Sequence, residues 1–407
     1  MQKAEIGIRT NDIPQVITAA FFVLYALRSA WLAFDKEMYS SWFTVVSLWT
    51  ARLCVPLGII YLCRQRKVES SFLALVFLPL IYYLMQVMHS YQGYAGGEEL
   101  RLITLVIFVL FSKEMKAKIF HFFYWVVQIQ NIIAILVWVA YFLNINIGFR
   151  REYFYSDNSV ERLIYYYRWT IFAIYNSGIT YRLCGIFNEP GGLGTLCALL
   201  FICTAQKTKL WEKLILLSAG ALTLSLAFYL LIFAYITVYV WGKNPKNIFF
   251  IVPVVILFLM IPQIDFHNEA LNALAARFAI VDGRLAGDNR ITAVFDARYA
   301  KFLKTNKKWF GMGYGFSFGG GNSSYKSHYI VPFGILGTAF LLGTWFVAAW
   351  HYAEKKKVAL LYAAFFFISL YQRPSAIFNC WGYVALLGGI EWQRLYFQPD
   401  KEVEVDD

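Results

Sequence analysis

The chain has 407 residues, of which 59% are hydrophobic and 19% aromatic, while only 15% are charged. Soluble globular domains carry about 25% charged residues, so this composition, with its mean hydropathy of +0.52, excludes an ordinary soluble protein. No polar stretch is long enough to fold as a separate cytosolic domain. We therefore expect residues 1–407 to form a single integral membrane domain without a nucleic-acid partner.

Apolar blocks follow one another along the chain, and a membrane-spanning helix needs about 20 such residues. The first block lacks a small-residue cleavage site and is expected to be a retained helix. We predict an all-α, polytopic bundle of about twelve spans. Ten or eleven spans are the alternative, because the blocks on either side of Ser225 can form one long kinked helix. The predicted spans cover 13–34, 42–63, 72–88, 102–111, 119–143, 192–205, 214–224, 227–240, 248–261, 331–350, 359–370 and 379–390.

Basic residues mark every second connection between these spans. Cytoplasmic loops are enriched in lysine and arginine, and a topology with both termini in the cytoplasm places all of these connections inside. The long connections 144–190 and 262–330 then lie outside, and the acidic segment 398–407 is expected to be a disordered cytoplasmic tail. The basic connections are 64–67, 113–118, 207–213, 243–246 and 355–357.

Lysine dominates the predicted inside segments, whereas arginine dominates the outside segments. A mobile lysine is sufficient for topology, but the planar guanidinium fork of arginine fits phosphate and carboxylate groups. The outer arginines therefore indicate a bound anion. The alternative is that they pair with acidic residues of the same loops, which are Glu152, Asp157, Glu161, Asp282 and Asp296.

Tyrosine alternates with arginine in the first outer connection. A tyrosine ring stacks on apolar faces, while its hydroxyl bonds polar groups, and this combination suits sugars. The alternative is an aromatic belt at the lipid boundary. Our candidate sugar-binding residues are Tyr153, Tyr155 and Tyr181, together with Tyr314 of the second outer connection.

The second outer connection is expected to be partly helical. An apolar stripe at helical spacing runs over residues 268–280, and a second amphipathic helix is predicted to start near Asp288. The glycine-rich segment 311–321 can either aim backbone N–H groups at phosphate or serve as a flexible connector. His328, just before the next apolar block, is a candidate general base or a structural residue.

Three local patterns together resemble the superfamily of O-antigen polymerases (Wzy-type) and O-antigen ligases (WaaL-type). The chain departs from the family pattern at two positions. Tyr329 follows His328 where members often carry Asn or Ser, and Leu226 follows Ser225 where members often carry Arg. The patterns are the stretch 182–191 entering an apolar helix, Asn289-Arg290 opening a helix ahead of 309–313, and His328 before a helix with Gly334 and Gly337.

The resemblance implies a metal-independent, inverting membrane glycosyltransferase without cofactors. Its donor and acceptor would be oligosaccharide repeats on undecaprenyl diphosphate, polymerised into O-antigen, capsular or exopolysaccharide at the outer face of a bacterial inner membrane. A chain-length regulator and a flippase in the same membrane are further partners that it allows.

An inverting transfer needs a base for the attacking hydroxyl and cations for the leaving diphosphate. We expect Arg182 and Arg290 to clamp the diphosphate with support from Arg298, and His328, or as second choice Glu189, to act as the base. The sequence contains no Asp-x-Asp motif and no Cys-x-x-Cys pair, so no metal site is expected.

Two rival functions remain open. An O-antigen ligase has the same fold and donor but transfers the polymer to a lipid core. A lipid-linked oligosaccharide flippase belongs to another class, and proton-coupled carriers usually bury carboxylates in their spans. The predicted spans contain no deep Asp or Glu, and Arg28 and Arg52 are their main charges, which favours the enzyme.

Overall fold

The computed structural model of the chain describes residues 13–31, 41–65, 73–90, 98–155, 163–176, 178, 180–187, 189–243, 249, 256, 260–281, 284–286, 292–316, 318, 324–353 and 357–396. These residues are mostly helical. The chain divides into two compact units. The first comprises Met1–Trp125, Phe340–Ala363 and Ala376–Asp407, and the second comprises Val126–Ala339 and Ala364–Ser375.

The first unit is a helical assembly in which α1 packs against α3 and α16, and α3 packs against α5. Its helices are apolar on most sides, as expected for helices that lie within a bundle or in lipid. An aromatic cluster forms the core, with ring centroids 5.1 Å apart for Phe22 and Phe111. The elements are α1 (Ile13–Trp31), α3 (Ser41–Arg64), α4 (Leu73–Met88), α5 (Glu98–Leu110), the first part of α6 (Lys113–Phe142), the later part of α14 (Val331–Ala353), the first part of α15 (Lys357–Ser369), α16 (Cys380–Tyr383), η8 (Val384–Gly388) and α17 (Gly389–Tyr396).

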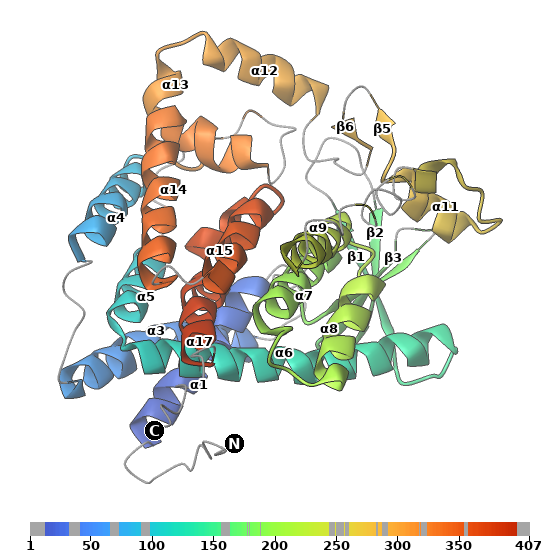
Figure 1. Cartoon of the computed structure of the whole chain (residues 1–407), viewed down its shortest axis with the longest axis horizontal. Helices are drawn as coiled ribbons and strands as arrows, with labels where there is room; N and C mark the ends of the chain where they lie inside the picture. Colours follow the sequence, from blue (N-terminus) through green and yellow to red (C-terminus); the bar gives the residue numbers. More distant parts are fainter. Residues whose placement is uncertain are drawn as a thin grey trace, which may run out of the picture. The chain divides into compact units, whose positions relative to one another are not determined.

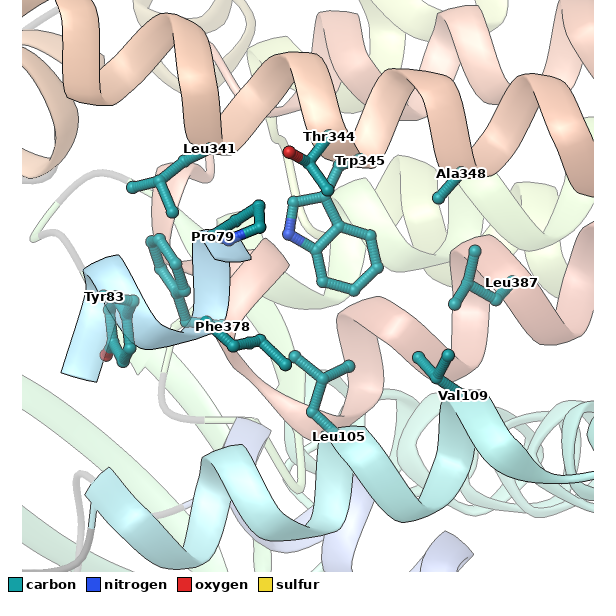
Figure 2. Close-up of a pocket in the computed structure, with 11 residues that line it drawn as sticks. Pro79, Tyr83, Leu105, Val109, Leu341, Thr344, Trp345, Ala348, Phe378 and Leu387 are labelled. Carbon is teal, nitrogen blue, oxygen red and sulfur yellow. The ribbon is translucent and has the colours of Figure 1, made fainter. Parts of the chain in front are cut away.

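A small apolar cavity of about 20 Å³ lies between α4, α5 and α14 of this unit. Figure 2 shows the Trp345 indole reaching from α14 into this space, with Leu105 of α5 beneath it. Tyr83 stacks on Phe378 at a centroid distance of 4.7 Å. A space of this size holds about one water molecule, and apolar spaces of this kind stay dry, so we attribute it to imperfect packing.

The second unit combines helices with a four-stranded antiparallel sheet in the order β1-β2-β3-β4. In Figure 1, α7, α8 and α9 lie together beside this sheet. The elements are β1 (Arg150–Tyr155), β2 (Leu163–Trp169), β3 (Phe172–Asn176), β4 (Tyr181–Gly185), α7 (Pro190–Thr204), α8 (Leu210–Leu222), α9 (Leu226–Lys243), η5 (Ile261–Gln263), α11 (Glu269–Ala276), β5 (Ile280–Val281), β6 (Arg284–Leu285), α12 (Ala293–Leu303), α13 (Lys307–Phe310) and η6 (Lys326–Ile330). One further element, η7 (Pro374–Phe378), crosses from this unit into the first.

The sheet occupies a segment that the sequence analysis treated as a loop. Aromatic and β-branched residues fit a pleated, half-buried surface, and this segment is rich in them. Tyr166 lies opposite Tyr175, and Tyr175 lies opposite Arg182 on the next strand. Because successive side chains point to opposite faces, these three share one face, while Tyr167 and Tyr181 point to the other.

Polar residues in the second half of α6 tie the sheet to the neighbouring helices. The Gln130 side-chain oxygen accepts a hydrogen bond from the Ile186 amide at 3.3 Å. Asn131 donates to the Cys197 sulfur of α7 at 3.4 Å, and Gln128 donates to a carbonyl of α8 at 3.0 Å. These three bonds hold the end of β4, α7 and α8 against α6.

Among the residues that the structure describes, two helices, Lys113–Phe142 and Lys326–Ala353, are long and apolar enough to cross a membrane. Shorter apolar helices include Pro190–Thr204 and Leu226–Tyr239. Helices lie over the predicted spans, except that most of the span 248–261 lies outside the described residues. The expected twelve spans therefore stay a prediction, whereas a mostly helical chain with helices able to cross a membrane is what the structure has.

Candidate anion-binding site

The site forms where two helices of the second unit begin next to each other. The chain leaves α8 at Leu222, turns through Leu224 with a left-handed φ of 46° and enters α9 at Leu226. A Cβ built on Gly194 in the first turns of α7 would lie 2.5 Å from Thr223 Oγ1. Glycine therefore permits this close approach, which brings the N-terminus of α7 beside that of α9. Both termini present N–H groups that lack partners within their helices and carry partial positive charge.

A cavity of about 330 Å³ opens at these two helix starts. Three arginines line it, and they come from distant parts of the chain: β4, the end of α11, and the turn after α15. One carboxylate, from Glu189, is among the described lining residues. The cavity is lined by Tyr166, Tyr175, Arg182, Glu189, Pro190, Gly191, Ser225, Leu226, Ala227, Arg277, Ala286, Gln372 and Arg373.

Two of the arginines are anchored on the backbone of the turn between α8 and α9. Arg182 donates from Nε to the Thr223 carbonyl at 2.8 Å and from Nη2 to the Leu224 carbonyl at 3.2 Å. Arg277 donates to the same Leu224 carbonyl at 3.2 Å. These bonds satisfy carbonyls left open at the end of a helix, so the turn positions both guanidiniums at the cavity.

The third arginine is held by the carboxylate of the cavity. Arg373 forms an ion pair with Glu189, and its side chain is 11% exposed, against 46% for Glu189. Glu189 is the N-cap residue of α7, but its side chain makes no capping hydrogen bond. Its carboxylate thus serves Arg373 and not the N-terminus of its own helix.

The positive charges of the cavity disfavour one another. Burial, with a second contribution from the charge of Arg277, lowers the pKa of Arg182 to about 10. Burial also lowers the pKa of Arg373 to about 10, with a second contribution from the charge of Arg182. Three guanidiniums facing one carboxylate leave positive charge in excess. A bound anion would offset both the desolvation penalty of the arginines and the repulsion between them.

Of the sequence-predicted site residues, the structure brings Arg182 and Glu189 together at this cavity. Arg298 donates to the carbonyl of Phe318. His328 lies in η6, where its Nδ1 is 3.3 Å from the Ser327 hydroxyl. Among the residues that the structure describes, neither Arg298 nor His328 lines the cavity.

The predicted sugar-binding tyrosines are dispersed. Tyr181 points to the sheet face opposite Arg182, where its ring packs 5.3 Å from that of Tyr141. Tyr314 lies beside Phe333, with ring centroids 6.3 Å apart. Arg290 and the side chains of Tyr153 and Tyr155 lie outside the part of the chain that the structure describes.

Two backbone N–H groups of the glycine-rich segment form hydrogen bonds within the fold. The Met312 amide donates to the Val331 carbonyl at 2.8 Å, and the Gly313 amide donates to the Pro332 carbonyl at 3.1 Å. A Cβ on Gly311 would overlap the Pro332 carbonyl. This part of the segment therefore packs against the start of α14, and these amides are not available to a phosphate.

Arg277 and Arg373 are site residues that no sequence pattern singled out. The signal that could have found them is the preference for arginine in segments that the span topology places outside. Arg277 follows the apolar stripe of α11, and Arg373 stands in the short connection between the last two predicted spans. Neither belongs to a local motif, so only the fold joins them to Arg182.

An apolar groove of about 430 Å³ lies between α9, η5 and α11 of the same unit. Ile232 and Ile236 of α9 line one side, and Leu271 and Leu274 of α11 line the other. Phe278, which also lines it, directly follows the cavity residue Arg277. The groove and the arginine cavity thus share the C-terminal end of α11.

The chain matches no protein-family model, no curated protein and no solved structure. Within the described ranges, no group of three or more His, Cys, Asp or Glu side chains could hold a metal ion. The cations that this cavity offers to a ligand are its guanidiniums. Such groups bind phosphate through paired hydrogen bonds, and helix N-termini bind it through backbone amides.

Proposed function

We propose that this protein polymerises lipid-linked oligosaccharide repeats, using undecaprenyl diphosphate as the leaving group, at the outer face of a bacterial inner membrane. It would be an inverting glycosyltransferase within a bundle of about twelve spans. The observation that carries the proposal is the cavity in which three arginines and two helix N-termini converge.

The cavity suits a diphosphate better than a single carboxylate. A diphosphate carries at least two negative charges, and the cavity offers Arg182, Arg277 and Arg373 with only Glu189 to oppose them. Charge-assisted hydrogen bonds from guanidinium groups are about twice as strong as neutral ones. The same groups would stabilise the charge that develops on a departing diphosphate.

The neighbouring groove supports a lipid carrier. Its described lining is almost wholly apolar, with side chains such as Ile232, Phe233 and Leu274. A polyprenyl chain would lie along α9 and α11 while its diphosphate enters the arginine cavity, because Phe278 of the groove directly follows Arg277 of the cavity in the chain. A soluble nucleotide donor would have no use for such a groove.

The span topology derived from sequence supports the side of the membrane. It places residues 144–190, the turn between 224 and 227, residues 262–330 and the connection 371–378 outside. The residues that line the cavity come from these segments and their edges. The chemistry would therefore occur on the non-cytoplasmic side, where arginines outnumber lysines in the predicted connections.

The transfer itself needs one base. The acceptor hydroxyl gives its proton to the base while its oxygen bonds to the anomeric carbon of the donor. The bond from that carbon to the diphosphate oxygen breaks, and the diphosphate leaves with the electron pair. Glu189 is the base in this scheme because its carboxylate lines the cavity, while the role of His328 remains a prediction from sequence.

Deletion of the gene and glycan gel analysis test the proposal. Complementation with Arg182→Ala, Arg290→Ala, Glu189→Gln or His328→Ala should give membrane-inserted protein at normal levels. We expect single-repeat glycan from the Arg182, Arg290 and Glu189 variants, and the His328 variant decides between the two candidate bases. Wild-type ladders from both Arg182→Ala and Glu189→Gln would overturn the site assignment.

The same deletion separates the rival functions. Loss of a polymerase leaves single repeats on the surface, whereas loss of a ligase leaves full-length polymer on its lipid carrier. Loss of a flippase leaves lipid-linked repeats on the cytoplasmic side. We expect the first outcome.

A further inference from the structure

The ion pair between Glu189 and Arg373 lies in the lining of the cavity. Arg373 lies against the first turn of α7, since a Cβ built on Gly191 would overlap its Nη2. A cation at a helix N-terminus is in an unfavourable place, because that end of the helix carries partial positive charge. Arg182 repels it as well. Glu189 is the described lining residue that offsets this charge.

The two partners differ in how firmly they are held. The Arg373 side chain is 11% exposed, while that of Glu189 is 46% exposed. Water can therefore solvate the carboxylate when it leaves the ion pair, whereas the guanidinium is mostly enclosed by protein. The Nε atom of Arg373 is also buried with no hydrogen-bond partner among the described residues, so the ion pair does not use all of its donors.

We infer that Arg373 exchanges partners when the substrate binds: the diphosphate replaces Glu189 on Arg373, and the released carboxylate becomes free to accept the proton of the acceptor hydroxyl. This inference rests on the proposed function. The carboxylate is an internal competitor in the empty cavity and a base only in the loaded one. Donor binding would thereby activate the base.

The exchange has a consequence that a structural brace does not share. If Glu189 competes with the anion, only molecules in which Arg373 is unpaired can bind it. The apparent association constant is then the intrinsic constant multiplied by the fraction of such molecules. Removing the carboxylate charge then tightens anion binding. If Glu189 only braces Arg373 in position, removing its charge leaves anion binding unchanged or weakens it.

The experiment measures binding of inorganic pyrophosphate to the full chain in nanodiscs by calorimetry. We expect Glu189→Gln to lower the dissociation constant about three- to tenfold and Arg373→Gln to raise it. In the Arg373→Gln background, Glu189→Gln should change it less than about twofold, because the two residues act as a unit. Asp296→Asn is the matched control, since its carboxylate pairs with Lys326 at 3.4 Å, away from the cavity lining.

Two further variants keep the outcome clear. Glu189→Asp retains the charge but withdraws it by one methylene, and it should bind pyrophosphate with intermediate affinity even if the Gln variant folds poorly. Unchanged or weaker binding by both Glu189 variants would overturn the exchange. If wild-type protein binds no pyrophosphate and Arg182→Gln makes no difference, the proposed diphosphate site itself fails, which is a distinguishable result.

Discussion

Each unit buries charged side chains, but the two do so in different ways. In the first unit, Lys116 is fully buried and donates to the Tyr352 hydroxyl at 3.1 Å. Glu391, also fully buried, pairs with Arg394 at 3.3 Å. There each charge packs directly on its partner. In the second unit, three guanidiniums and a single described carboxylate surround a space of about 330 Å³.

The difference separates charges that belong to the fold from charges that would serve the proposed anion site. A buried charge that packs on an opposite or polar partner is part of the folded core, and removing one partner lowers stability. A group of like charges around an open space costs stability in the empty protein, and it is retained where it serves a site. The sharpest test of this contrast is to remove one charge from each unit.

The largest expected effect follows from Arg182→Gln. The variant loses a guanidinium that both faces the cavity and bonds the Thr223 and Leu224 carbonyls. We expect glycan elongation to fall about 10²- to 10³-fold, the loss usual for one donor that stabilises developing negative charge. Chain length and yield on glycan gels, at matched protein levels, measure it.

Arg182→Lys is the control for this variant. Lysine keeps the charge but lacks the fork that reaches two carbonyls, so we expect an intermediate loss. Activity equal to wild type in the Lys variant would mean that charge alone matters and that the anchoring on the turn between α8 and α9 is incidental.

A smaller effect is expected from the packing of the two helix N-termini. Gly194→Ala would place its Cβ 2.5 Å from Thr223 Oγ1 and 2.7 Å from the Ser225 Cβ. Overpacking of this kind costs about 1–3 kcal/mol. Because the clash pushes α7 away from the turn, we expect pyrophosphate affinity to fall along with the melting temperature.

Gly192→Ala provides a matched comparison in the same helix. A Cβ on Gly192 meets nothing within 4 Å, and alanine favours a helix over glycine by about 1 kcal/mol. This variant should be at least as stable as wild type and bind pyrophosphate equally well. Equal losses in both glycine variants would show that the helix start tolerates no side chain, whatever its contacts.

The sequence was informative where the structure depends on local pattern. Apolar blocks predicted helices that the structure contains, and the stretch 182–191 predicted that Arg182 and Glu189 would belong together. The sheet was missed because Tyr and Arg stand on both of its faces, so no apolar and polar alternation was visible. The partnership of Glu189 with Arg373 joins residues far apart in the chain, and no period or motif can reveal it.

The smallest expected effect on the site comes from Lys116→Met in the first unit. The variant loses a hydrogen bond from a charged donor and a cation–π contact of 4.4 Å with the Tyr352 ring. Loss of such a bond costs about 1–3 kcal/mol, so the melting temperature should fall. The dissociation constant for pyrophosphate should stay within about twofold of wild type, because Lys116 serves packing alone.

The double variant Lys116→Met with Tyr352→Phe sharpens this last expectation. Tyr352 also donates to the Val109 carbonyl at 3.4 Å, so the hydroxyl left behind by Lys116→Met keeps one partner. Tyr352→Phe removes this remaining bond as well, so the double variant should lose about 1 kcal/mol more of unfolding free energy than Lys116→Met alone. Weaker pyrophosphate binding in a well-folded Lys116 variant would break the contrast, because a charge assigned to the fold would then be acting on the anion site.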